Sequence, residues 1–216
     1  MLEVLFFSFI SSTVNTALAP QTSNNYEAGV RHYFTDTAYA HINYFRMDTK
    51  QEIIFNPLSF MNENLDGKTR RDGIEISASA KLTEKISVRS SYTYLKAEIK
   101  DGTFAGKEVP NVPEHKASVE VVSALGNGFS AAVNGVFIGE RPFISDFQNT
   151  FSKQKSYTVL NTKLMYEKKA IKAFVAINNL LNKEYSEYGV IGGFPQERAY
   201  YPSPKRNLTA GLSVNF

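Results

Sequence analysis

The sequence of 216 residues contains no cysteine and no tryptophan. Without cysteine the chain has neither a disulfide framework nor a thiolate metal site, and it is compatible with passage through an oxidising compartment. Its 24 basic and 21 acidic residues leave a net charge of +3, too small and too mixed along the chain to indicate nucleic-acid binding. The best apolar run, Val4 to Ile10, is far shorter than the roughly 20 residues of a membrane-spanning helix.

Histidine is also scarce. His32, His41 and His115 do not have the spacing of metal ligands, and no serine or carboxylate is tied to His115 by spacing as a nucleophile or base. We therefore expect no catalysis and no resident metal or cofactor.

Alternating apolar residues are abundant, and the last ten residues, Asn207 to Phe216, show the pattern most clearly. One parity of this segment is apolar to its end, and the other is small or polar. In a membrane barrel the apolar face would contact lipid, whereas in a soluble protein it would contact a core. The apolar positions are Leu208, Ala210, Leu212, Val214 and Phe216.

Two hairpins obey one register rule. A three-residue turn at Thr35 to Thr37 predicts Phe34 opposite Ala38 and Val30 opposite Ile42, with both apolar sets on one face. The same arithmetic places the alternating run Ile74 to Leu82 against Ile86 to Tyr94 around the turn TEK.

The whole chain contains about nine such strands. Short turns at TDT, TEK, ALGNG and EKKA alternate with long segments, and this sorting is typical of an outer-membrane barrel with short periplasmic turns and long outer loops. The predicted fold is all-β: an antiparallel up-and-down meander that forms part of a transmembrane β-barrel. A soluble β-sandwich binding module and a barrel of another class, porin or enzyme, stay open as alternatives. The long segments are Asn56 to Gly67, Ile99 to Glu114, Arg141 to Lys155 and Lys183 to Lys205.

Longer motifs resemble a particular family. The run NNLLNKEYSEYG (Asn178 to Gly189), followed by YYPSPKRNLTAGLSVNF, resembles the C-terminal end of a TonB-dependent outer-membrane receptor. The segments LAPQTSNNYEAGV, GKTRRDGIE, SYTYLKAE and VPNVPEHKAS resemble successive barrel segments of that family, so the similarity extends from about Asn15 to Phe216. Each motif also has an architectural interpretation. In NNLLNKEY the alternation breaks, which indicates a bulge that directs the chain into a loop, and Pro202 and Pro204 place the last strand after them.

The resemblance implies a location in the bacterial outer membrane and uptake of iron-siderophore or related metal-chelate ligands, driven by TonB through a plug domain. A complete member has a TonB box, a plug and a barrel of about 22 strands, so the sequence is expected to be a piece that does not transport alone. We expect residues 20–216 to form the barrel segment. Residues 1–19 are either a signal-like segment or a loop and strand remnant of a longer parent.

Two sets of site residues follow. Cationic and aromatic loop residues suit an anionic, partly aromatic chelate, although they also suit an interfacial girdle and a solvated loop: Arg141, Phe143, Tyr188, Phe194, Arg198 and Tyr201. In the resembling family the final strand and its terminal aromatic are recognised by the barrel-assembly machinery, which assigns that role here to Leu208, Leu212, Val214 and Phe216.

Overall fold

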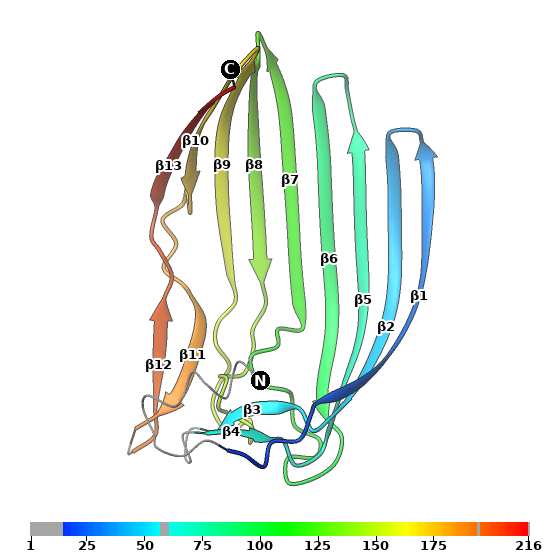
Figure 1. Ribbon diagram of the computed structural model, residues 1–216, viewed down its shortest axis with the longest axis vertical. Helices are drawn as coiled ribbons and strands as arrows, with labels where there is room; N and C mark the ends of the chain where they lie inside the picture. Colours follow the sequence, from blue (N-terminus) through cyan, green and yellow to red (C-terminus); the bar gives the residue numbers. More distant parts are fainter. Residues whose placement is uncertain (1–14, 57–60, 194, 216) are drawn as a thin grey trace.

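The computed structural model describes residues 15–56, 61–193 and 195–215. Nine strands form one antiparallel sheet, the wall, in which each strand pairs with the next wall strand along the chain (Figure 1). No helix in these ranges is long and apolar enough to cross a membrane. The wall strands are β1 (Thr22–Thr35), β2 (Ala38–Lys50), β5 (Lys68–Lys81), β6 (Ile86–Ile99), β7 (His115–Gly126), β8 (Phe129–Ile138), β9 (Tyr157–Lys168), β10 (Ile171–Asn178) and β13 (Asn207–Val214).

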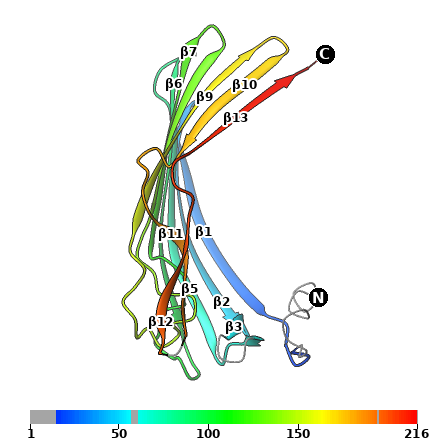
Figure 2. The ribbon, with the colours of Figure 1, turned by 90° about the vertical axis from the view of Figure 1, so that its left-hand side faces the viewer.

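The wall is a single, open, twisted layer. Its edge strands β1 and β13 curve toward the same side, which gives the sheet a concave and a convex face (Figure 2). The predicted meander of about nine strands is confirmed, and the described residues do not form the two stacked sheets of a β-sandwich. An open curved sheet of this kind fits part of a larger barrel.

The predicted registers are confirmed except at one turn. Val30 pairs with Ile42 as expected, but Thr35, not Phe34, lies opposite Ala38. The register shifts between Tyr33 and Thr35, so the prediction for Phe34 was wrong. A β-bulge adds one unpaired residue to β1 there. The alternation of the residues before the turn does not indicate such a bulge.

The other hairpins follow their turn chemistry. Ile76 pairs with Tyr92, as the TEK turn requires. Between β7 and β8 the turn residues Asn127 and Gly128 have φ angles of 52° and 87°, the two positive values that an Asn-Gly hairpin turn needs. A Cβ on Gly128 would lie 2.6 Å from the carbonyl oxygen of Glu167, so glycine also permits the close approach of β9.

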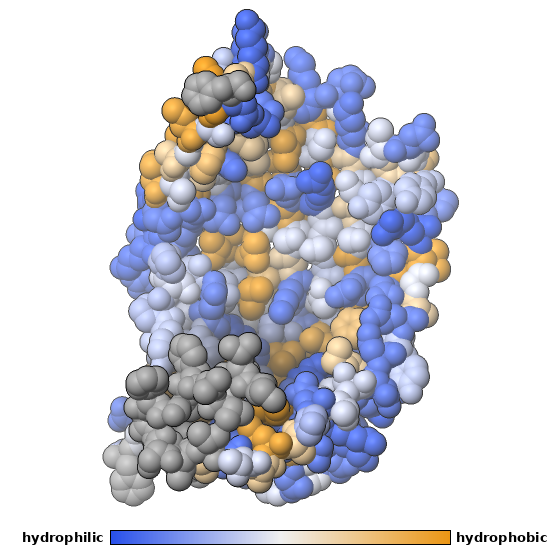
Figure 3. Space-filling model, viewed as in Figure 1, coloured by the Kyte–Doolittle hydropathy of each residue, from blue (hydrophilic) through white to orange (hydrophobic). Residues whose placement is uncertain are grey.

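The two faces of the wall differ in chemistry because side chains alternate across a strand. The convex face is apolar: Val30, Ile42, Ile76 and Tyr92 form one cross-strand row over β1, β2, β5 and β6. The concave face is more polar, and its hydrophilic residues are visible in Figure 3. There Ser91 and Ser118 pair with their hydroxyl oxygens 2.8 Å apart.

The long connections gather at one end of the wall, as predicted, and the short turns lie at the other (Figure 1). We call residues 51–67, 100–114, 139–156 and 179–206 the loop layer. This layer contains two small hairpins that the alternation pattern did not predict, because each is only a few residues long. They are β3 (Ile53–Asn56) with β4 (Met61–Asn64), and β11 (Ser186–Gly192) with β12 (Glu197–Pro202).

A hydrophobic cluster lies where the loop layer meets the wall. Leu65, Ala97, Ile99 and Val109 are almost fully buried in it. They come from two loops and the end of β6, so the cluster joins segments far apart in sequence. Ile54, Phe104, Val112 and Phe147 pack against its surface.

Two glycines lock neighbouring loops together. Gly67 and Gly102 have φ angles of +123° and +78°. A Cβ on Gly67 would lie 2.1 Å from the Asp101 carbonyl oxygen, and one on Gly102 would lie 2.1 Å from the Asp66 carbonyl oxygen. Each loop backbone therefore occupies the space that a side chain on the other would need.

An ion pair attaches the first loop to the wall. The Glu52 carboxylate accepts hydrogen bonds from Arg71 Nη1 and Nη2 at 3.0 and 2.7 Å, and another from the Thr69 hydroxyl. Burial alone would raise the pKa of Glu52, but the hydrogen bonds from Arg71 and Thr69 outweigh it and lower that pKa below 4.5.

Only part of the N-terminal segment is described. Residues 1–14 lie outside the described residues, so the signal-like interpretation of residues 1–19 stays a prediction. Asn64 anchors the adjoining chain, because it donates to the Ala19 carbonyl at 2.9 Å and accepts from the Ala19 amide at 2.8 Å.

Candidate functional site

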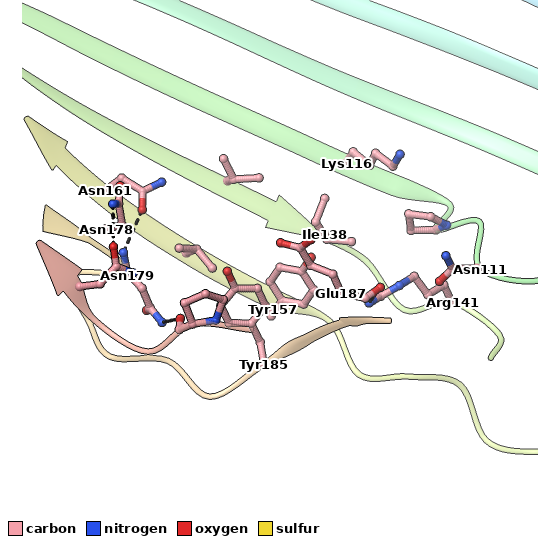
Figure 4. A pocket seen from close by; sticks show the side chains of 15 residues that line it. Asn111, Lys116, Ile138, Arg141, Tyr157, Asn161, Asn178, Asn179, Tyr185 and Glu187 are labelled. Carbon is pink, nitrogen blue, oxygen red and sulfur yellow. Dashed lines mark hydrogen bonds between the residues drawn. The ribbon is translucent and has the colours of Figure 1, made fainter. Parts of the chain in front are cut away.

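A cavity of about 580 Å³ lies between the concave face of the wall and the loop layer. We call it the Arg141 cavity. Strands β7 to β10 and β13 contribute side chains from one side, and the loops contribute Asn111, Arg141 and Glu187 from the other (Figure 4). The cavity is therefore assembled from segments spread over nearly one hundred residues of sequence.

Arg141 is the most deeply buried charge that lines this cavity, with 2% of its surface exposed. Its backbone bridges to Gln154, which fixes the Cα position. Its Nη2 donates to the carbonyl oxygens of Ser186 and Glu187 at 2.8 and 2.9 Å. Nη1 has no hydrogen-bond partner and is itself covered.

An aromatic pair forms the cavity floor beside the guanidinium. The rings of Tyr157 and Tyr185 lie 4.5 Å apart between centroids at 35°, and the Arg141 Cζ atom lies 5.5 Å from the Tyr157 centroid. This cation–π contact places positive charge and two aromatic faces side by side.

Burial removes the Arg141 guanidinium from water, and nearby groups only partly replace the lost hydration of its charge. Burial lowers the pKa of Arg141, and the attraction of Tyr157 and Glu187 only partly offsets it. No ion pair between described residues includes Arg141. Because arginine stays protonated even so, the cavity carries a buried positive charge.

Asparagines line the opposite end of the cavity. Asn179, with φ of 50° and 2% exposure, directly follows β10. Its amide nitrogen Nδ2 donates to the Lys183 and Pro204 carbonyls at 2.8 and 3.2 Å, and its Oδ1 accepts from the Lys183 amide at 2.8 Å. The Asn161 side chain accepts from the Asn179 backbone amide at 2.9 Å.

These contacts explain the break in alternation in NNLLNKEY. Asparagine tolerates a positive φ and satisfies backbone groups with its side chain, so it lets the chain leave the strand here. The start of β13 is tied to the same region, because Asn178 donates to the Asn207 side chain at 2.9 Å.

The six predicted ligand residues have different environments. Among those described, Arg141 alone lines the cavity. Phe143 is fully buried and packs edge-on against the Tyr200 ring at 5.4 Å. Tyr188 and Tyr201 face each other across the β11–β12 hairpin with ring centroids 5.2 Å apart. Arg198 donates to the Ser152 hydroxyl at 2.6 Å.

The remaining predicted residues lie at or beyond the described edges. Phe194 and Phe216 are outside the described residues. Leu208, Leu212 and Val214 are on the free edge strand β13, exposed on the convex face. Ligand contact and assembly recognition both stay predictions for these two sets.

Several cavity residues escaped the sequence analysis as site candidates. Asn178, Asn179 and Tyr185 belong to the quoted NNLLNKEY motif but were interpreted as architecture. Asn111 belongs to the quoted segment VPNVPEHKAS and Tyr157 to the aromatics near strand ends, but neither was selected as a site residue, because only the packing of separate loops brings them beside Arg141. Within the described ranges no group of His, Asp and Glu residues has the arrangement of a metal site.

The family is decided by comparison with known proteins. Residues 4–180 match the family model described as "TonB dependent receptor-like, beta-barrel". The chain belongs to the TonB-dependent receptors. Members of this family are outer-membrane proteins of Gram-negative bacteria.

Individual TonB-dependent receptors are similar over most of the chain. The metal-pseudopaline receptor of Pseudomonas aeruginosa is 27% identical over 215 residues, which cover 93% of this chain and 28% of that protein. The ferrichrome outer membrane transporter/phage receptor of Escherichia coli K12 is 27% identical over 178 residues, covering 77% of this chain and 23% of that protein. The chain therefore spans less than a third of the length of these relatives.

A solved structure shows the same fold. The crystal structure of the ferric yersiniabactin uptake receptor of Yersinia pestis superimposes with a TM-score of 0.76 at 21% identity, over 91% of this chain and 30% of that one. The open wall thus has the fold of a portion of a TonB-dependent receptor barrel.

Proposed function

We propose that this chain forms part of an outer-membrane receptor that captures an iron-siderophore or related metal chelate for TonB-dependent uptake. The observation that carries the proposal is the Arg141 cavity, a cationic and aromatic pocket at the loop end of a receptor-family wall. Its relatives include receptors named for metal-pseudopaline and for ferrichrome. An anionic, partly aromatic chelate would suit this cavity, because a guanidinium binds anionic oxygens and tyrosine rings offer flat contact surfaces.

The wall supplies the membrane-embedded part in this proposal. Its convex row of apolar residues faces lipid, and the Phe129–Tyr166 pair near the short-turn rim, with ring centroids 4.7 Å apart, belongs to an aromatic girdle. The loop layer then faces the outside, where it meets the ligand. Arg141, Tyr188, Arg198 and Tyr201 are kept as proposed ligand contacts and Phe194 as a predicted one, whereas the fully buried Phe143 ring supports the packing of the loop layer.

Transport needs more than capture. In the family mechanism TonB acts through a plug domain, so the property that can be tested on these 216 residues is chelate capture. Binding by outer-membrane vesicles that contain the chain tests the proposal, with radioactive ⁵⁵Fe presented as several chelate types. Saturable binding of one chelate is expected, and a folded, membrane-integrated chain that retains none of them contradicts the proposal.

The final strand is proposed as the contact for the barrel-assembly machinery. β13 has a free backbone edge that can pair with another strand, while Leu212 and Val214 present a fixed apolar face. We expect Phe216→Asp, in a complete receptor that contains this chain, to slow assembly far more than Ser213→Asp on the other face. Heat-modifiability on a gel after membrane fractionation measures the folded fraction, and normal folding of the Phe216 variant alone would refute the signal.

A further inference from the structure

A group of basic side chains lies on the convex face of the wall where β2, β5 and β6 approach the loop layer. Two-residue steps along these strands from Ile42, Ile76 and Tyr92 place the basic residues on the same face as the apolar row. We call the group the basic cluster. It consists of Arg46, Lys50, Lys68, Arg70 and Lys96, together with Lys100, which directly follows β6.

Part of the basic cluster lines a cleft of about 350 Å³. Lys50, Lys68, Arg70 and Lys100 contribute four positive charges to its lining, and Asp48 contributes one negative charge. Neutral polar residues at the start of β1 complete the lining. The cleft therefore combines an excess of positive charge with neutral hydrogen-bonding groups.

Exposed ion pairs hold several of these cations. The Arg70 Nε atom lies 2.7 Å from Asp48 Oδ1, and Lys68 Nζ lies 3.4 Å from Asp101 Oδ2. Lys50 belongs to no ion pair between described residues. Because ion pairs at an exposed surface are weak, an anion of higher charge can replace a carboxylate as the partner of these cations.

An exposed aromatic and apolar row marks the boundary of the basic cluster. Tyr44, Ile74 and Tyr94 are neighbours in the register of the convex face. The next row toward the loop layer already contains Arg46 and Lys96. Two residues of a strand span about 6–7 Å, and the headgroup region on each side of a bilayer is about 5–7 Å thick. With the aromatic row at the edge of the apolar band, the first charged rows lie at headgroup depth.

The other half of the convex face lacks such charges. On β7, β8 and β9 the positions in the Tyr92 row are Ala117, Phe137 and Thr158. No lysine or arginine follows them toward the loop end on the convex face of these three described strands. Strands β5 and β6 extend further in that direction (Figure 1). The basic cluster is therefore a local feature and not a belt around the wall.

We propose that the basic cluster binds the headgroup of a phosphorylated membrane lipid. Its phosphate lies in the cleft beside Lys50 and Arg70, and its acyl chains lie along the exposed row of Tyr44, Ile74 and Tyr94. The inference rests on the membrane orientation in the proposed function and adds a lipid partner that chelate capture does not require.

The charge of the basic cluster favours a phosphate monoester. Six cations face four carboxylates, which leaves an excess of two positive charges. A phosphate monoester carries about −1.5 to −2 near neutral pH, whereas a phosphodiester or a lipid carboxylate carries only one negative charge. The carboxylates are Asp48, Asp72, Glu98 and Asp101.

Two substitutions should change lipid binding in opposite directions. Lys50→Gln removes a cation without leaving a carboxylate unpaired, and we expect it to weaken binding of phosphatidic acid by about fivefold or more. Asp48→Asn releases Arg70 from its carboxylate, and we expect it to strengthen that binding by about threefold. Damage to the fold would weaken binding in both variants, so the opposite signs distinguish a binding role from a structural one.

Matched controls change the same charges on the concave face. Lys163→Gln removes a lysine whose Nζ atom lies 4.3 Å from the centroid of the Phe174 ring. Glu75→Gln removes a carboxylate of β5 that projects away from Ile74 and Ile76. Both variants alter the net charge as the test variants do, and phosphatidic acid binding should stay within about twofold of the parent.

Native mass spectrometry of the full chain in detergent micelles measures lipid binding, with EDTA present so that no metal bridges the phosphate. The probes carry the same dioleoyl chains: phosphatidic acid, phosphatidylglycerol and a neutral diacyl glycolipid. We expect phosphatidic acid to bind about tenfold more tightly than the glycolipid and about threefold more tightly than phosphatidylglycerol. Inorganic phosphate is the soluble competitor, and it should displace phosphatidic acid only weakly because it lacks acyl chains.

The outcomes separate this inference from the proposed function. If the three lipids bind equally, or if Lys50→Gln and Asp48→Asn leave phosphatidic acid affinity within twofold of the parent, the lipid site is wrong. If inorganic phosphate competes as well as phosphatidic acid does, the basic cluster binds soluble anions and the lipid assignment is wrong. Binding of ⁵⁵Fe chelates is measured on the same variants. Its loss in a parent chain that keeps its lipid selectivity overturns chelate capture alone.

Discussion

The wall and the loop layer are stabilised in opposite ways. The wall is held by backbone pairing and exposes large apolar side chains, such as Val30 at 67% and Leu212 at 73%. The loop layer and the strand ends beside it contain nearly all the fully buried side chains, including Phe143, Ile99 and Thr69. Irregular segments thus pack like a small globular core, whereas the regular sheet lacks one. The sheet depends on its surroundings for stability, and the loops depend on each other.

Truncating a buried loop ring should have the largest effect. Phe143→Ala is expected to destabilise the loop layer by about 3–5 kcal/mol, because the ring is fully buried against Tyr200 and Gly189. Phe129→Ala, which removes a half-exposed ring at the short-turn rim, should cost only about 1 kcal/mol. Hydrogen exchange resolves the two regions, and equal losses would contradict the contrast between them.

A charge on the convex face should destabilise the wall and leave the stability of the loop layer unchanged. Ile76→Lys, in the middle of the cross-strand row, is expected to lower folding stability in lipid by about 2–4 kcal/mol. Ser77→Lys projects to the concave face and serves as the matched control. Urea titration of bilayer-inserted protein measures both, and a larger loss for Ser77→Lys would reverse the assignment of the faces.

Asn179, the residue that follows β10, tests the junction between the wall and the loop layer. Asn179→Ala should destabilise the chain by about 2–3 kcal/mol, because it leaves the Lys183 amide and two carbonyls without the partner they have in the folded chain. Asn182→Ala, at an exposed position where the side chain accepts one hydrogen bond from the Arg206 amide, should cost about 1 kcal/mol. Protease cleavage between residues 180 and 206 reports the junction directly.

The Glu52–Arg71 pair predicts a modest pH dependence of the loop attachment. The pKa of Glu52 in the folded chain is below its ordinary value of 4.5. The contribution of the ionised Glu52 to folding stability is therefore complete above pH 4.5 and is lost as the pH falls through the lower folded pKa. Glu52→Gln should cost about 1–2 kcal/mol near neutral pH and flatten this acid transition. Hydrogen exchange of the Leu65 amide, which is bonded to the Glu52 carbonyl at 2.7 Å, follows the change.

The sequence alone was sufficient to predict the strands of the wall, because alternation with a period of two residues and the residue types of turns are local signals. The TEK turn and the start of the final strand could be placed to the residue, whereas the register shifts at Phe34 and between Ala124 and Gly126 were missed. The loop layer was not predictable in the same way. Burial of Arg141 depends on carbonyls of Ser186 and Glu187, 45 and 46 residues away, and no local pattern encodes that packing.

The candidate site was therefore found only in part. Arg141 was selected for its charge in a long loop, but no local pattern indicates that Asn111 and Tyr157 lie beside it. Phe143 was selected as a ligand-contact candidate in a long loop, and its ring is buried in the loop layer. Loop aromatics look the same in the sequence whether they contact a ligand or pack against each other.

The interlocked glycines Gly67 and Gly102 bear on how such receptors diversify. Each lacks a side chain because the backbone of the other's loop lies in that space. A side chain at either glycine would collide with the backbone of the other loop, so a substitution there requires a matching shift of both loop backbones. The two loops therefore form one structural unit. Replacing one of them with a loop from another receptor requires that the other be replaced with it.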